Sequence, residues 1–278
     1  MSNIMDKFNT ALNTEPAMPI NKQAVASAFG KAAKNYDNAA AFQRKVGHLL
    51  LEELPHLHAV GSHKKAIDVG CGTGYFSAEL VKLGFNVTAV DLSLEMLAQA
   101  KQRCNSDCDY LLADAENLPL ADNSYDIAFS SLALQWCDDL AVPLQELKRI
   151  VRPGGMIFFT TLVDGSLNEL KDAWAQVDQY QHVNDFKTEN EIKVALAQTG
   201  TQIDKLVFSP IVVHYPSALG LMKDLKGIGA THLQQKRKNV LLGRKTLNAL
   251  EHAYDAYRDE SYLLPATYQV CFGVLIND

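Results

Sequence analysis

The most informative segment of this 278-residue chain is Ala66-Ile67-Asp68-Val69-Gly70-Cys71-Gly72-Thr73-Gly74. Its first part, Ala66 to Val69, is a mostly apolar run of the kind that forms a buried parallel strand. Three alternating glycines follow, and a backbone without Cβ atoms can turn sharply and come close to a ligand. A helix is predicted from about Thr73 to Leu83, and it would offer its amide-rich N-terminus to that ligand. The segment therefore predicts a nucleotide pocket.

The spacing of the glycines separates two kinds of nucleotide site. Dinucleotide sites use G-x-G-x-x-G and hold pyrophosphate at the helix terminus, whereas this chain reads G-x-G-x-G. Asp68 would also repel a pyrophosphate, but it would accept a cation or a hydroxyl. These features resemble the glycine motif of the class I S-adenosylmethionine (SAM) methyltransferases. The resemblance implies SAM as the cofactor, bound over Asp68, Gly70, Cys71, Gly72 and Gly74.

A second acidic residue follows the next predicted strand, Asn86 to Asp91. Nucleotide-binding sheets place a ribose-binding carboxylate about 20 residues past the glycines. Asp91 fits that role. The alternative is an ordinary aspartate at a strand end, or a cap for the helix that begins near Ser93.

The third predicted strand, Asp109 to Ala113, runs into Asp114-Ala115-Glu116-Asn117-Leu118-Pro119. A carboxylate there can accept from the exocyclic amine of an adenine, and the methyltransferase resemblance supports this role. By position in the family's motifs, the resemblance assigns further cofactor contacts to Leu92, Met96, Asp114, Ala115, Glu116 and Ser131.

Apolar strands alternate with amphipathic helices through the rest of the central region, and this pattern predicts a parallel α/β sheet with right-handed crossovers. Ligands bind such sheets at the carboxyl ends of the strands, where all of these motifs lie. Methyltransferase sheets end in an antiparallel pair, so we expect a Rossmann-like sheet of that class. The remaining predicted strands are 125–131, 156–160, 202–208 and 268–276, and the predicted helices are 22–34, 38–54, 94–103, 140–151, 167–180 and 188–198.

Composition excludes several other classes. The length suits one α/β core with additions, and 47% of the residues are hydrophobic, as in a globular chain. No apolar run approaches the roughly 18 residues that cross a bilayer, and Met1 to Ile20 lacks the apolar centre of a signal peptide. Five cysteines without C-x-x-C pairing and eight scattered histidines predict no metal site. We expect a cytoplasmic protein that does not bind membranes.

The chain outside the sheet is expected to set specificity. We divide the sequence into a disordered tail at 1–20, cap helices at 21–60, a SAM-binding core at 61–215, a helical basic lid at 216–265 and a final core strand at 266–278. Tyr36, between the cap helices, is placed either over the methionine moiety of the cofactor or under the first helix as an anchor. Arg44 is either a clamp for the SAM carboxylate or a solvated residue.

The lid is strongly basic although the whole chain carries a net charge of −6. A cationic face on an anionic protein usually serves an anionic partner. The alternative is an ordinary lysine-rich helix surface, and nucleic acid is disfavoured because no aromatic platform accompanies the charges. Up to Leu250 a lone Asp224 stands against Lys223, Lys226, Lys236, Arg237, Lys238, Arg244 and Lys245.

Three segments carry a more specific resemblance, from about Val25 to the last strand. They look like those of the malonyl-acyl-carrier-protein O-methyltransferases, which open the biotin pathway: Phe29-Gly30-Lys31-Ala32-Ala33-Lys34-Asn35-Tyr36, Ser131-Leu132-Ala133-Leu134-Gln135-Trp136-Cys137 and Leu225-Lys226-Gly227-Ile228-Gly229-Ala230-Thr231-His232. The resemblance implies SAM-dependent methylation of the free malonyl carboxylate to its methyl ester. It also implies an acyl-carrier protein as partner, met by Lys223, Lys226, Lys236, Arg237 and Lys238.

The implied reaction needs no general base, because a carboxylic acid with a pKa near 4 is already ionised at neutral pH. Exclusion of water and close positioning are expected to supply most of the rate. Tyr36, Gln135 and Trp136 are the predicted catalytic residues, with Gln135 and Trp136 walling the channel for methyl transfer, although Trp136 is as readily a packing aromatic. An Arg or Lys is expected to aim the carboxylate. The alternatives are a methyltransferase for a small quinone or other metabolite, and a nicotinamide-dependent oxidoreductase.

Overall fold

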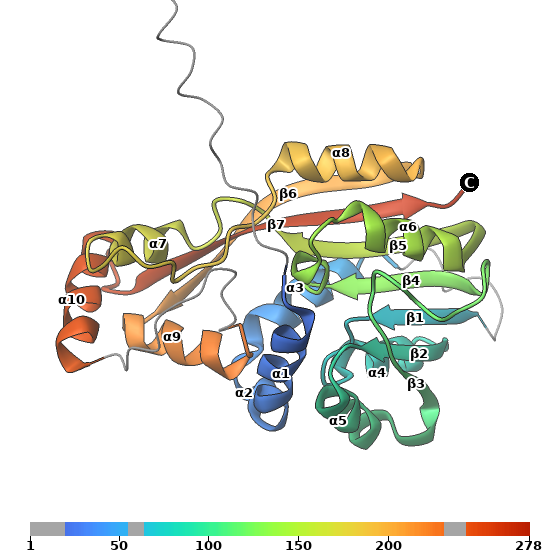
Figure 1. The fold of residues 1–278 in the computed structure, drawn as a ribbon, viewed down its shortest axis with the longest axis horizontal. Helices are drawn as coiled ribbons and strands as arrows, with labels where there is room; N and C mark the ends of the chain where they lie inside the picture. The colour runs from blue at the N-terminus through green and yellow to red at the C-terminus, as the bar shows by residue number, and fades with distance from the viewer. Residues whose placement is uncertain (1–19, 55–63, 231–242) are drawn as a thin grey trace, which may run out of the picture.

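The computed structural model describes residues 20–54, 64–230 and 243–278. At its centre is a seven-stranded sheet with the strand order β3-β2-β1-β4-β5-β7-β6 (Figure 1). Strands β1 to β5 run parallel, and β7 lies antiparallel between β5 and β6. The predicted sheet class, with its terminal antiparallel pair, is confirmed.

The parallel strands coincide with the apolar runs of the sequence. In β1 and β4 most side chains are buried, as expected for strands that are covered on both faces. The parallel strands are β1 (Lys65–Val69), β2 (Asn86–Asp91), β3 (Cys108–Leu112), β4 (Tyr125–Ser131) and β5 (Val151–Leu162). The helices on the two faces of the sheet are α3 (Ala41–Leu51), α4 (Tyr75–Lys82), α5 (Leu94–Cys104), α6 (Ala141–Ile150) and α8 (Glu189–Thr199).

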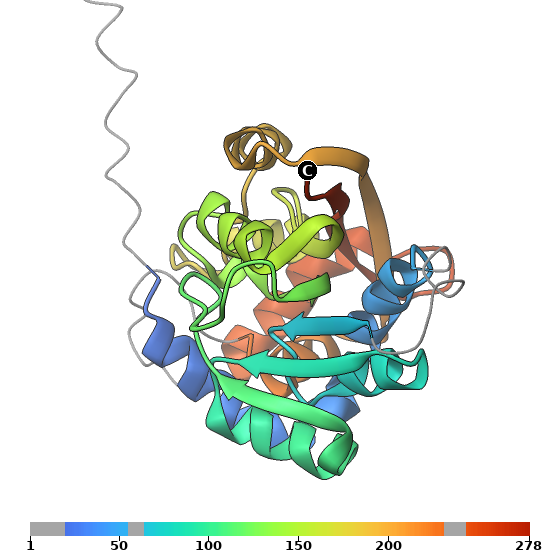
Figure 2. The same cartoon turned by 90° about the vertical axis from the view of Figure 1, so that its right-hand side faces the viewer.

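Two layers of helices enclose the sheet (Figure 2). Helices α6 and α8 cover one face, where Leu147 and Leu196 join the same core as Ile157. Helices α3 and α4 cover the other face, where Leu50 and Leu80 pack with strand residues of β1, β4 and β5. With both faces buried, the strand ends are the part of the sheet left for a ligand.

The N-terminal helices differ in detail from their prediction. Helix α1 (Lys22–Ala32) continues as a 3₁₀ turn, Ala33–Asn35, and the predicted second helix is divided into α2 (Tyr36–Ala39) and α3. The division falls at Ala40, which is buried and whose φ of −92° and ψ of 25° leave the helical region. The 3₁₀ turn before Tyr36 and the break at Ala40 thus leave Tyr36 at the start of a short separate helix.

The last two strands, β6 (Gln202–Tyr215) and β7 (Leu264–Ile276), are longer than predicted. They pair from Gln202 opposite Ile276 to Tyr215 opposite Leu264. The prediction ended the first of them at Phe208, shortly before Pro210. A proline is nevertheless accommodated in an edge strand, and β6 is the edge of this sheet.

The insertion predicted as a lid, residues 216–265, spans the segment between these strands and the first two residues of β7. It contains α9 (Ala218–Gly227), α10 (Arg244–Tyr254) and a 3₁₀ turn, Asp255–Tyr257. Side chains of α9 and α10, including Leu221 and Leu250, share an apolar core with α7 (Asn168–Ala175). Its division from the core as a separate domain stays a prediction.

The Leu225 to Ala230 part of the family-like motif places the end of α9 against α1. Gly229 has a φ of +77°, and a Cβ there would lie 3.0 Å from the carbonyl oxygen of Ala28 and from Cα of Phe29. Only glycine fits this backbone and this approach. The motif thus brings α9 next to the helix that covers the strand ends.

Candidate active site

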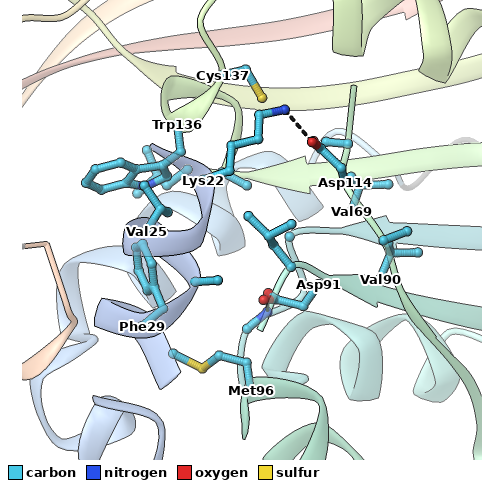
Figure 3. Close-up of a pocket in the computed structure, with 18 of the residues that line it drawn as sticks. Lys22, Val25, Phe29, Val69, Val90, Asp91, Met96, Asp114, Trp136 and Cys137 are labelled. Carbon is cyan, nitrogen blue, oxygen red and sulfur yellow. Dashed lines mark hydrogen bonds and ion pairs between the residues drawn. The ribbon is translucent and has the colours of Figure 1, made fainter. Parts of the chain in front are cut away.

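A pocket lies at the carboxyl ends of β1, β2 and β4 and beside the loop that follows β3, and α1 forms its roof (Figure 3). It encloses about 770 Å³, part of it open to solvent. Eight of the predicted cofactor residues line this first pocket: Gly70, Gly72, Asp91, Leu92, Met96, Asp114, Ala115 and Ser131. The strand ends thus bring together motifs that are far apart in the sequence.

The glycine loop has the strained backbone that its sequence predicts. Gly70, Gly72 and Gly74 have φ values of 77°, 55° and 76°. A Cβ on Gly70 would lie 2.2 Å from Cβ of Ala133, so the packing at this position also excludes a side chain. Helix α4 begins at Tyr75 and not at Thr73, because the left-handed Gly74 precedes it.

Asp91 stands at the end of β2 and faces the pocket. Its Oδ2 accepts a hydrogen bond from the backbone N–H of Gly72 at 2.8 Å, and its Oδ1 accepts one from the N–H of Ser93 at 2.8 Å. Burial raises the pKa of Asp91, although these hydrogen bonds oppose the rise. Each carboxylate oxygen has further acceptor capacity, which suits the two hydroxyls of a ribose.

Asp68 lies beneath the glycine loop and does not line the pocket. It is buried, and its Oδ2 accepts a hydrogen bond of 2.6 Å from the hydroxyl of Ser77 in α4. Burial raises the pKa of Asp68 to about 7. In this geometry Asp68 connects the end of β1 to α4 on either side of the loop, and its direct contact with a cofactor stays a prediction. Cys71 and Gly74 likewise support the loop without lining the pocket.

Lys22 of α1 was not predicted as a site residue, yet it holds α1 to the loop that follows β3. Its Nζ contacts Oδ2 of Asp114 at 2.5 Å and also pairs with Glu116 (Figure 3 shows the Asp114 contact). Partial burial lowers the pKa of Lys22, but the two carboxylates raise it by more, so the net shift is upward. Glu116 itself lies outside the pocket lining.

Arg44, the predicted carboxylate clamp, lines neither of the pockets at this site. Its Nη1 donates to the carbonyl oxygen of Asp37 at 2.7 Å. The side chain of Asp37 accepts from the hydroxyl of Thr73 at 2.8 Å and pairs with Arg103. These contacts connect the cap helices to the glycine loop. The role of Arg44 as a clamp stays a prediction.

A second pocket of about 660 Å³ adjoins the first. Four residues line both pockets, and we call them the shared wall: Phe29, Tyr36, Leu132 and Trp136. The rings of Phe29 and Trp136 meet edge to face with centroids 5.3 Å apart. Burial raises the pKa of Tyr36, so its phenol stays neutral. The predicted catalytic residues Tyr36, Gln135 and Trp136 thus meet at this junction.

Leu132 has a backbone that the sequence did not reveal. Its φ of 52° lies in the left-handed region, which is costly for a residue with a Cβ. Its N–H donates to the backbone and side-chain oxygens of Thr160, and its carbonyl accepts from Nε2 of Gln135 at 2.7 Å. These bonds hold Leu132 in the shared wall. The position after a buried strand was the one available signal, and it does not predict a left-handed backbone.

The described part of the insertion places two of the predicted carrier-binding lysines, Lys223 and Lys226, on the exposed surface of α9. Lys226 borders an open groove together with Lys31 of α1. Lys236, Arg237 and Lys238 lie outside the described residues.

The first pocket suits SAM better than a dinucleotide. Gly72 has open space where a Cβ would stand, so the backbone there can meet a ligand closely. Among the described lining residues the only Lys or Arg is Lys22, and its charge is already matched by two carboxylates. A pyrophosphate would therefore find no free cation, whereas a ribose would meet Asp91.

The sequence also predicted that the chain has no metal site and no membrane-spanning segment. All five cysteines are free thiols and buried. In the described ranges, no cluster of three or more His, Cys, Asp or Glu side chains is arranged to hold a metal ion. None of the described helices combines the length and apolar character that a bilayer crossing needs.

Comparison with known proteins agrees with this geometry. A family model described as "Methyltransferase domain" matches residues 67–159, from β1 into β5. A malonyl-[acyl-carrier protein] O-methyltransferase of Yersinia pestis is 42% identical over all of both chains, and one of Serratia marcescens is 46% identical over 93% of this chain and 97% of its own.

Solved structures share the fold at lower identity. A putative methyltransferase of Bacillus halodurans C-125 superposes with a TM-score of 0.58 over 82% of this chain and 98% of its own, at 14% identity. Such a likeness concerns the fold alone. The full-length relatives go further, and they show that this chain belongs to the family of the malonyl-[acyl-carrier protein] O-methyltransferases.

Proposed function

We propose that this enzyme uses SAM to methylate the free carboxylate of a malonyl group carried by an acyl-carrier protein, an early step of biotin biosynthesis. The observation that carries the proposal is the pair of adjoining pockets with one shared wall. The first pocket has acidic and apolar groups suited to an adenosyl moiety. The second is largely apolar and suited to a slender thioester arm.

SAM, when bound, supplies a methyl group on a cationic sulfur. A carboxylate oxygen forms a bond to that methyl carbon while the carbon–sulfur bond breaks. The electron pair of the broken bond returns to sulfur. The malonyl carboxylate needs no deprotonation at neutral pH. The task of the protein is therefore to align the oxygen with the methyl carbon and to exclude water. The rings of Phe29, Tyr36 and Trp136 are placed to do both at the junction of the pockets.

The carrier protein is proposed to dock beside α9. Lys223 and Lys226 are exposed there, and carrier proteins of this kind are acidic, so opposite charges would steer and orient the encounter. The motif at the end of α9 places this surface next to α1, which covers both pockets. The predicted cytoplasmic location goes with this partner and stays a prediction.

The deciding experiment compares malonyl-carrier protein with malonyl-CoA in the presence of SAM. We expect a methyl ester on the malonyl-carrier protein, detected by mass spectrometry, with a higher kcat/KM than for malonyl-CoA. An enzyme that binds SAM but methylates neither thioester would overturn the proposal. Equal use of both thioesters would remove the role of the carrier protein and leave the chemistry intact.

A further inference from the structure

Two glutamine side chains of the second pocket carry polar atoms that are buried and unpaired. In the described part of the chain, neither Oε1 of Gln43 in α3 nor Oε1 of Gln135 has a hydrogen-bond partner, although both are inaccessible to solvent. Both residues line the second pocket. An unpaired buried acceptor costs about 1 to 3 kcal/mol, so two at one pocket call for an explanation.

The two amides are held differently. Gln135 is oriented because its Nε2 donates to the carbonyl of Leu132, which leaves its oxygen as an acceptor for something else. The side chain of Gln43 makes no hydrogen bond within the described residues, and its neighbour Phe42 stacks on Tyr268 with ring centroids 3.9 Å apart. Its amide can therefore turn either end toward a ligand, since oxygen and nitrogen have nearly the same shape.

The prediction that an Arg or Lys aims the carboxylate stays a prediction, because its lid candidates Lys236, Arg237 and Lys238 lie outside the described residues. Among the described residues that line the second pocket there is no Arg and no Lys. His182 lines it, but its Nε2 lies 2.8 Å from Asp178, so that pair adds no net cation. Within the described lining, a carboxylate that enters here therefore meets no net positive charge.

We propose that Gln43 and Gln135 form a neutral amide pair that recognises the malonyl thioester at two points. Gln43 donates its N–H to the free carboxylate, and Oε1 of Gln135 accepts the pantetheine amide N–H nearest the thioester. A neutral donor orients the carboxylate without removing the charge that makes its oxygen nucleophilic, as a close guanidinium would. This inference rests on the proposed function and adds its specificity residues.

The two roles predict different signatures in one binding experiment. The enzyme loaded with S-adenosylhomocysteine (SAH) is titrated by calorimetry with malonyl-carrier protein and with acetyl-carrier protein, which lacks the carboxylate. Gln43→Leu should weaken malonyl binding about 10-fold or more, the loss expected for a hydrogen bond to a charged group, and leave acetyl binding unchanged. Gln135→Leu should weaken both by a similar factor, because both carriers have the pantetheine amide.

Controls separate the possible failures. Gln198→Leu, an exposed glutamine of α8, should change neither affinity. Gln43→Glu should repel malonyl and not acetyl, and unchanged SAH binding shows that each variant is folded. If wild-type enzyme does not prefer malonyl over acetyl, the proposed function fails. If it does, and Gln43→Leu keeps the preference or Gln135→Leu abolishes it selectively, the amide-pair inference alone is overturned.

Discussion

Asp68 couples the glycine loop to pH. Its pKa is raised by burial from 3.8 to about 7, so between these values the folded protein keeps a proton that the unfolded chain releases. The stabilising contribution is complete below pH 3.8 and is lost as the pH rises through about 7. The free energy of unfolding should therefore fall across this window, by up to about 1.4 kcal/mol per pH unit.

Asp68→Asn should reduce this slope and raise stability at pH 8 relative to wild type, because the amide keeps the acceptor for Ser77 and cannot ionise. Urea unfolding of the ligand-free protein at pH 5, 6, 7 and 8 measures the effect. Asp109→Asn, at an exposed position of β3, should keep the wild-type slope. An unchanged slope in Asp68→Asn would contradict the assignment.

The sequence reveals a site residue only where local chemistry is unusual. The alternating glycines and Asp91 stood out because of their spacing, and the structure places Gly70, Gly72 and Asp91 at the pocket. Phe29 and Lys22 carried no such signal, since an aromatic or a lysine on an amphipathic helix is ordinary. Their importance depends on how α1 lies across the strand ends, which is a tertiary fact.

At the scale of elements, Lys22 is the ionic attachment of α1 to the loop that follows β3. Lys22→Met should keep the helix but leave Asp114 and Glu116 without their cation. We expect SAH to bind about 10-fold more weakly and to dissociate faster, because the bonds that hold α1 to the loop after β3 are lost. Stopped-flow and calorimetric measurements test this, with the exposed Lys31→Met as the matched control on the same helix. Equal effects of both changes would show that helix α1 is merely sensitive to lost charge.

Helix α9 should serve the carrier and not the cofactor. Lys223→Glu combined with Lys226→Glu is expected to raise the KM for malonyl-carrier protein several-fold at low salt, and less at high salt because surface charges are screened. SAH affinity should not change. Lys193→Glu on the distant α8 is the charge-matched control. Loss of SAH binding in the double variant would indicate structural damage.

The elements themselves were largely predictable, and the exceptions have physical causes. Apolar runs located every strand, because buried strands need them. The pattern did not show that α2 and α3 separate at Ala40, since nothing in the local residues demands a break. It also ended β6 at Phe208, whereas the strand continues through Pro210 to Tyr215, because an edge strand accepts proline and the sequence does not say which strand is at the edge.

At the scale of the whole molecule, the preferred cofactor should be visible as added stability. SAH at 100 times its dissociation constant should contribute about 2.7 kcal/mol to the free energy of unfolding. For a chain of this length that corresponds to a rise in melting temperature of about 5 °C or more. NAD at the same concentration should leave the melting temperature unchanged, because the described lining of the first pocket offers no free cation to a pyrophosphate. Stabilisation by NAD alone would contradict the assignment of this pocket.

The shared wall has a consequence for turnover. Helix α1 contributes Phe29 to the second pocket, and the same helix is fastened by Lys22 beside the first pocket. A ligand that fills the first pocket thereby completes the wall of the second pocket. We expect a compulsory order of addition, in which the methyl donor enters first and its demethylated remnant departs last.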